Sequence, residues 1–134
     1  MTPPRLQDLW ADLNARYFRG GLPPIEIQWS RRLTSSTGMF VSRVGPRARA
    51  GPERHRVIRL SVPLLRGPRP APEREVLATL AHEMIHQWQY DRLRRRPDHG
   101  AEFRRKMAEM NRDGLGITVR HDLEDAVRAF VRHV

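Results

Sequence analysis

The stretch that decides the fold runs from Glu73 to Arg94 and reads EREVLATLAHEMIHQWQYDRLR. Its apolar residues recur every three or four positions, which is the spacing of one face of an α-helix. This face comprises Val76, Leu77, Leu80, Met84, Ile85 and Trp88. The pattern predicts a long amphipathic helix over residues 73–94, which ends before Pro97 because the residue before a proline disfavours the helical conformation.

The same predicted helix carries the pentad His82-Glu83-Met84-Ile85-His86. Residues four apart lie about 40° apart around a helix axis, so the two imidazoles project side by side, as one Zn²⁺ requires. Glu83 lies next to the metal rather than on it, where it would take a proton from a water activated by the zinc. The pattern predicts an H-E-x-x-H peptidase site with one zinc per chain. Surface histidines on an amphipathic helix are the alternative interpretation.

A catalytic zinc needs a third protein ligand and an open position. The metzincin class places a glycine and a histidine three and six residues after the second ligand, where this chain has Gln89 and Arg92, so that class is excluded. Two candidates stay open: Glu102, on the next predicted helix, and His99, in the turn between the two helices. The turn favours His99, because the chain reverses at Gly100 toward the zinc helix.

Outside this region, apolar spacing and turn residues predict a small set of further elements. We expect helices over residues 2–18, 101–111 and 122–133, strands near 25–29, 38–44 and 55–61, a short extended stretch at 117–119, and loops over 45–54 and 63–72. This order predicts an α+β fold, in which a small antiparallel sheet of about three strands packs against helices. The pentad would lie on the central helix, as in zincins.

The chain has 134 residues, 25 basic against 15 acidic side chains, a net charge of +10 and no cysteine. The length predicts a single domain over residues 1–134. The lack of cysteine excludes a disulfide scaffold, a thiolate zinc finger and a cysteine nucleophile. No apolar run approaches the roughly 20 residues that span a bilayer, and no signal-peptide core is present, so we expect a cytoplasmic protein without a membrane partner.

The chain resembles the SprT-like domain of the SprT/Spartan metalloprotease family over about residues 5–120. The resemblance rests on the motif His82-Glu83-Met84-Ile85-His86-Gln87-Trp88 followed by His99-Gly100-Ala101-Glu102-Phe103, and on the pieces Leu9-Trp10, Leu13-Asn14, Tyr17-Phe18, Gly21-Leu22-Pro23 and Trp29-Ser30-Arg31-Arg32-Leu33-Thr34. It implies that His99 is the third zinc ligand beside His82 and His86, that Glu83 is the general base, and that Glu102 does not bind the metal.

Eukaryotic members of this family cleave proteins crosslinked to DNA. The resemblance therefore implies a zinc metalloendopeptidase that acts on DNA-bound or DNA-crosslinked proteins, with single-stranded or damaged DNA as a partner. Many members carry a further cysteine-containing zinc module, and its role is not carried over to this cysteine-free chain. The alternative function is a zinc-stabilised nucleic-acid-binding module with little or no peptidase activity, which the +10 charge also favours.

Two basic clusters flank the candidate zinc ligands in the sequence. They comprise Arg92, Arg94, Arg95 and Arg96 after the helix, and Arg104, Arg105 and Lys106 after His99. We interpret them as a candidate phosphate-binding rim, against the alternative of an ordinary solvated face. A second candidate is the loop that carries Arg47, Arg49, Arg54 and Arg56. All but one of the Lys and Arg residues are arginine. Two causes would explain this excess: a role in contacting phosphate, or a GC-rich coding bias.

Two tryptophans have two interpretations each. Trp29, at the end of a predicted strand, is a candidate for stacking on a nucleobase, or it packs within the sheet. Trp88, one turn after His86, would line a substrate cleft or belong to the core, and its place on the apolar helix face favours the core.

Overall fold

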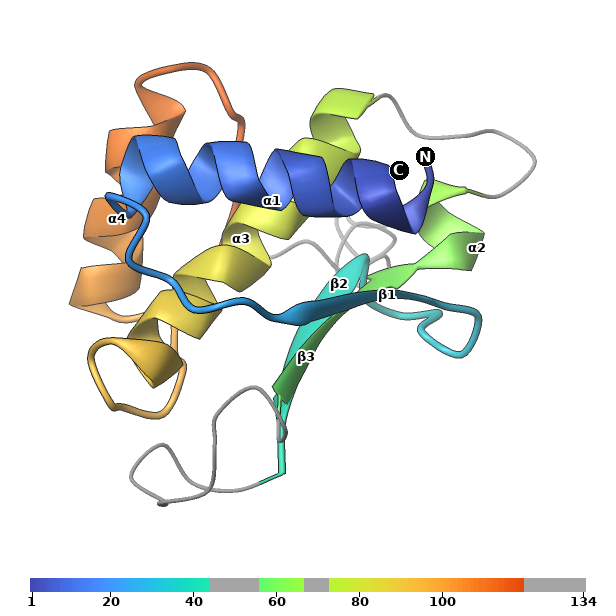
Figure 1. The fold of residues 1–134 in the computed structure, drawn as a ribbon, viewed down its shortest axis with the longest axis horizontal. Coiled ribbons are helices and arrows are strands. Elements are labelled where there is room, and N and C mark those ends of the chain that lie inside the picture. The colour runs from blue at the N-terminus through green and yellow to red at the C-terminus, as the bar shows by residue number, and fades with distance from the viewer. Residues whose placement is uncertain (44–55, 67–72, 120–134) are drawn as a thin grey trace, which may run out of the picture.

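The computed structural model describes residues 1–43, 56–66 and 73–119 (Figure 1). In chain order the elements are α1 (Pro3–Tyr17), β1 (Glu26–Ser30), β2 (Gly38–Ser42), β3 (Arg56–Ser61), α2 (Val62–Leu65), α3 (Glu73–Asp91) and α4 (Ala101–Asn111). The predicted α+β class is confirmed. The predicted loop over 45–54 and the predicted helix over 122–133 lie outside the described residues.

The three strands form one mixed sheet in the order β1–β3–β2. β3 runs parallel to β1 and antiparallel to β2, so the expectation of a purely antiparallel sheet is wrong for one of the two pairs. The physical reason lies in β3, whose Ile58 and Leu60 are both 0% exposed. A strand buried this completely takes the centre of the sheet and separates β1 from β2, although those two strands are neighbours in the chain.

α3 is the element around which the others are arranged, because it packs against α1, α4, β2 and β3. In Figure 1, α1 crosses in front of α3, and the three strands lie below α1. Its apolar residues Leu80, Met84 and Ile85 are fully buried, as the periodicity predicts. Its polar residues His82 and Glu83 are buried as well, so this polar side of the helix faces protein rather than solvent.

α3 ends at Asp91, three residues before the predicted end. Arg94 adopts a left-handed φ of 59°, and the Arg95 N–H donates to the Gln89 carbonyl oxygen at 3.0 Å. The chain therefore reverses before it reaches Pro97. α4 then begins after Gly100, and residues 97–99 return alongside α3.

Two smaller expectations are also wrong. The start of the predicted loop over 63–72 belongs to α2, where Ser61 Oγ accepts a hydrogen bond from the Leu64 N–H at 3.1 Å and caps the first turn. The rest of that predicted loop, residues 67–72, lies outside the described residues. Residues 117–119 form no strand, because the Asn111 side chain binds both the N–H and the carbonyl of Ile117, at 2.7 and 2.8 Å, and holds a loop there.

No helix in the described part of the chain has the length and apolar character needed to cross a membrane.

Arg56 is buried and paired rather than available to phosphate, so its assignment to a phosphate-binding loop is wrong. Its side chain is 0% exposed and forms a bidentate ion pair with Asp91, with both nitrogen–oxygen distances at 2.6 Å. Gln87 Nε2 donates to the same carboxylate at 3.0 Å. This network ties the start of β3 to the end of α3. The remaining members of that predicted cluster, Arg47, Arg49 and Arg54, lie outside the described residues.

Candidate metal centre

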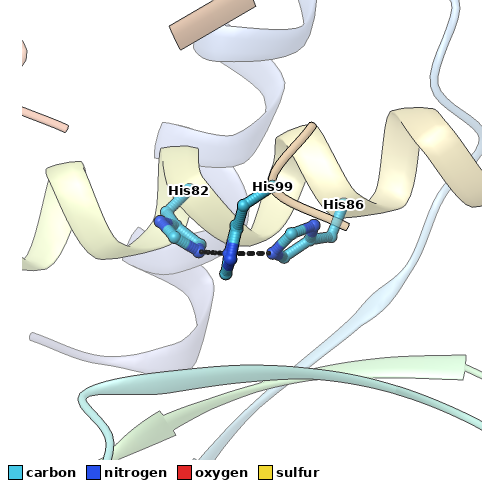
Figure 2. A group of neighbouring side chains, drawn as sticks. All are labelled: His82, His86 and His99. Carbon is cyan, nitrogen blue, oxygen red and sulfur yellow. Dashed lines mark hydrogen bonds between the residues drawn. The ribbon is translucent and has the colours of Figure 1, made fainter. Parts of the chain in front are cut away.

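Three histidines meet in a cleft between α3 and β2 (Figure 2). His82 and His86 come from α3, and His99 comes from the turn before α4. The His99 Nε2 atom lies 3.3 Å from His82 Nε2 and 3.2 Å from His86 Nε2. Three nitrogens bound to one tetrahedral zinc at about 2.0–2.1 Å are about 3.3–3.4 Å apart. The spacing and chemistry of these donors therefore fit one such ion.

The cleft around these nitrogens has a volume of about 350 Å³. Its wall includes Gly38, Met39 and Phe40 from β2, and Glu83 from α3. His82 is 2% exposed and His86 is 8% exposed, whereas His99 is an exposed residue of the turn. Two of the donors thus lie in the interior, and the third approaches them from the surface.

The second ring nitrogen of each buried histidine faces an oxygen. His82 Nδ1 lies 2.8 Å from the carbonyl oxygen of Thr118, and His86 Nδ1 lies 3.0 Å from Gln89 Oε1. An oxygen acceptor at Nδ1 favours the tautomer that carries its proton there. The Nε2 lone pairs of both rings are then directed into the cleft, as metal binding requires.

Phe103 of α4 forms an aromatic wall against the three histidine rings. Its ring centroid lies 4.8 Å from that of His82 and 4.9 Å from those of His86 and His99. Phe103 is 0% exposed, so it excludes water from this side of the imidazoles. An apolar wall of this kind restricts solvent access and lowers the local dielectric around a metal.

Glu83 lines the cleft beside His82 and is 2% exposed. Gly38 at the start of β2 allows the strand to approach it. A Cβ atom at position 38 would lie 2.6 Å from Thr79 Cγ2 and 3.2 Å from Glu83 Oε2, so a larger residue would push β2 away from α3. Glu102 instead forms an ion pair with Arg95, and it is not among the three clustered residues.

Lys106 is engaged inside the fold. Its Nζ donates to the Tyr17 carbonyl at 2.7 Å, pairs with Glu109 at 2.9 Å and lies about 5 Å from the ring centroids of Phe18 and Trp88. Only 14% of its side chain is exposed. This geometry places it among the contacts that hold α4 to the end of α1, away from the metal cleft.

The arginines of the two basic clusters are exposed on the turn and on the start of α4. Two of them also have partners within the chain: Arg95 pairs with Glu102, and Arg104 Nε donates to the carbonyl oxygen of His99 at 3.0 Å. The exposed set comprises Arg92, Arg94, Arg95, Arg96, Arg104 and Arg105. The structure therefore brings positive charge close to the third histidine.

Both tryptophans pack against other parts of the fold. Trp88 contacts Phe18, with a centroid separation of 6.3 Å, and is not part of the cleft wall, as its core interpretation predicts. Trp29 is half-buried, donates from its indole nitrogen to the Met1 carbonyl at 3.1 Å, and lies 5.0 Å below the Arg66 guanidinium.

Sequence reasoning missed several residues that complete the site. The sequence marks Gln89 only as one of the two residues that exclude a metzincin, although its side chain contacts His86. The Thr118 carbonyl has no signal in the sequence, because every residue has a backbone oxygen. The proximity of Phe103 to all three rings depends on the angle between α3 and α4, which periodicity does not give.

Comparisons with known proteins agree on one family. The model of the SprT-like family matches residues 6–121. The chain is 36% identical over 135 residues to the DNA-dependent metalloprotease SPRTN of Bos taurus, 35% over 133 residues to that of Homo sapiens, and 34% over 133 residues to the DNA-dependent metalloprotease dvc-1 of Caenorhabditis elegans. Each match covers 97% of this chain but only 25%, 25% and 34% of the relative, so the chain spans a quarter to a third of their length.

Proposed function

The chain belongs to the SprT-like family, and from that membership we propose that it is a zinc-dependent metalloendopeptidase. The observation that carries the proposal is the meeting of His82, His86 and His99 in a cleft that Glu83 also lines. The three imidazoles would hold one zinc ion per chain. The matched relatives are named metalloproteases, so a nucleic-acid-binding module without peptidase activity is not favoured.

Glu83 is the residue that we assign to proton transfer. When bound, zinc supplies the Lewis acidity that brings the pKa of a water molecule toward neutrality. The Glu83 carboxylate would take a proton from the water as its oxygen bonds to the peptide carbonyl carbon. It would pass that proton to the leaving amine nitrogen as the C–N bond breaks, so one group would act first as base and then as acid. Burial between α3 and β2 keeps this carboxylate in a fixed place beside His82, which limits the reorganisation that the reaction requires.

The substrate would bind as an extended peptide along β2. This strand pairs with β3 along one edge, and no described strand pairs with its other edge. Such an edge offers backbone N–H and carbonyl groups to a peptide that adds as a further strand. Met39, which is 42% exposed and lines the cleft, would provide an apolar contact for a substrate side chain. The arrangement favours unfolded or loop segments of a protein as substrates.

The DNA association of the substrate is a further part of the proposal. The matched relatives are named DNA-dependent, and the exposed arginines beside His99 would attract phosphates. We assign this contact to Arg92, Arg94, Arg95, Arg96, Arg104 and Arg105. Arginine suits this role because its planar guanidinium pairs with phosphate through two hydrogen bonds. DNA bound there would hold a crosslinked protein close to the cleft.

The test of this function is cleavage of one protein in two forms, free and crosslinked to a single-stranded oligonucleotide. We expect cleavage that stops on chelation, returns with zinc and is faster for the crosslinked form. Replacing Arg94, Arg96 and Arg105 by alanine should slow only the crosslinked form, because phosphate contacts matter only there. The charge-matched control replaces Arg31, Arg32 and Arg74, which are exposed and outside the cleft wall. If neither the free nor the crosslinked form is cleaved in a zinc-dependent way, the proposal is refuted.

The identity of the third ligand gives a separate prediction. His99→Ala should lower the zinc affinity by more than about 100-fold, beyond the loss typical of an outer partner of a ligand. Glu102→Ala should leave it unchanged, since Glu102 pairs with Arg95 instead. Competition with a chromogenic chelator measures both affinities. Loss of zinc in Glu102→Ala alone would show that the assignment of His99 is incorrect.

A further inference from the structure

Gln89 connects the two parts of the candidate metal centre. It lies three residues after His86 on α3 and is 3% exposed. Its Oε1 atom is 3.0 Å from His86 Nδ1 and 3.2 Å from the backbone nitrogen of Asp98, which donates to it. Its Nε2 donates to Asp98 Oδ1 at 3.1 Å. One buried amide thus contacts a histidine of the helix and the residue that precedes His99 in the turn.

The contacts with Asp98 fix which end of the amide faces His86. The backbone N–H of Asp98 can only donate, so the atom that it meets must be the amide oxygen. The Asp98 carboxylate accepts, so its partner must be the amide nitrogen. With the oxygen thereby turned toward His86, Nδ1 of that ring is the protonated nitrogen and the Nε2 lone pair is directed toward the other two histidines.

The same contacts hold the turn that carries His99. Asp98 Oδ1 also accepts the Gly100 N–H at 3.0 Å, which fixes the backbone on both sides of His99. Residue 89 anchors the start of the turn as well, because its carbonyl oxygen accepts the Arg95 N–H at 3.0 Å. That backbone contact does not depend on the side chain at position 89. A substitution there would therefore remove the amide contacts and keep this anchor.

We propose that Gln89 is a positioning residue for two of the three metal ligands: it selects the His86 tautomer and, through Asp98, holds His99 within reach of the metal. The inference rests on the metal centre of the proposed function. It adds that the position of His99, the exposed third ligand, depends on Gln89, a buried side chain of the same helix that provides His82 and His86. Gln89 itself is assigned no metal contact, since it is not part of the cleft wall and its amide oxygen is engaged by His86 and by the Asp98 N–H.

The test compares zinc affinity in the wild type and in Gln89→Leu, measured by chelator competition on the full chain. Leucine has a similar size and no polar atoms, so we expect the affinity to fall by about 10- to 100-fold, the usual effect of losing the partner of a histidine ligand. Nitrogen chemical shifts of the His86 ring in the zinc-free protein report the tautomer. They should show the Nδ1-protonated form in the wild type and a mixture in the variant.

Two variants of Asp98 keep the test decisive if Gln89→Leu does not fold. Asp98 is an exposed residue, so neither variant should endanger folding. Asp98→Asn keeps the oxygen that accepts from Gln89 and Gly100, and should bind zinc within about threefold of the wild type, while Asp98→Ala should bind more weakly by about tenfold. Equal affinities in this pair, or a folded Gln89→Leu that matches the wild type, would overturn the inference. Failure of the wild type to bind zinc would instead refute the proposed function.

Discussion

Replacing Glu83 by glutamine is expected to lower peptide-bond cleavage by about 10²- to 10⁴-fold, the contribution typical of a general acid–base group. Glutamine has nearly the same shape but cannot accept a proton from water. The zinc content should stay at one per chain, because the three histidines are unchanged. Cleavage of casein and of a DNA-crosslinked protein gives the rate, and atomic absorption gives the metal content.

A matched substitution on the same helix controls for the loss of charge. Glu75→Gln changes an exposed carboxylate in the first turn of α3, two turns before Glu83, and should leave the rate unaltered. The combination of retained zinc and lost cleavage is what separates a proton-transfer role from a structural one. If Glu83→Gln cleaves as fast as the wild type, the base is another residue. If it loses zinc, Glu83 supports the metal centre instead.

Breaking the ion pair between Arg56 and Asp91 should have the largest effect on stability. Both side chains are buried, at 0% and 1% exposure, so removing one leaves a buried charge without its ionic partner. Such changes cost about 3–5 kcal/mol. We expect Asp91→Ala to lower the free energy of unfolding by this amount in urea titrations. The double variant Arg56→Met with Asp91→Leu should recover much of the loss, because neither charge then remains.

The exposed pair between Arg5 and Glu73 is the control for this experiment. Its side chains are 50% and 58% exposed, and its nitrogen–oxygen distance is 3.0 Å. In Arg5→Met, water solvates the remaining Glu73 carboxylate, so this change should cost less than about 1 kcal/mol. Equal effects of Asp91→Ala and Arg5→Met would show that burial does not govern the strength of these pairs in this fold.

The sequence predicts the helices of this fold better than its sheet. The long helix α3 appears directly in the spacing of Leu80, Met84 and Ile85, because helical contacts are local. The parallel pairing of β1 with β3 depends on which strand is buried most, and this is decided by packing between residues distant in the chain. The burial of Arg56 was missed for the same reason: Asp91, its partner, lies 35 residues away.

Within the candidate site, the sequence predicts the groups to which we assign the chemistry and not those that contact them from behind. His82, Glu83 and His86 share one helix, so their spacing alone brings them together. His99 was expected near them because the chain reverses at Gly100, and the family resemblance implied it as a ligand. Gln89 and the Thr118 carbonyl orient the rings through contacts that depend on the turn before α4 and the loop after it. Neither contact follows a recurring motif.

The enclosure of Lys106 has a consequence for the chemical reactivity of the surface. It is the single lysine in the sequence, and its amine lies among two aromatic rings, a carbonyl and a carboxylate. Reagents or enzymes that acylate lysine therefore meet a shielded amine, and the other members of the Lys and Arg set are arginines, whose guanidinium groups keep their charge in proteins. The attraction of the exposed arginines beside His99 for polyanions should accordingly persist after lysine acetylation and at alkaline pH. A lysine-rich surface would lose its positive charge, and with it this attraction, under both conditions.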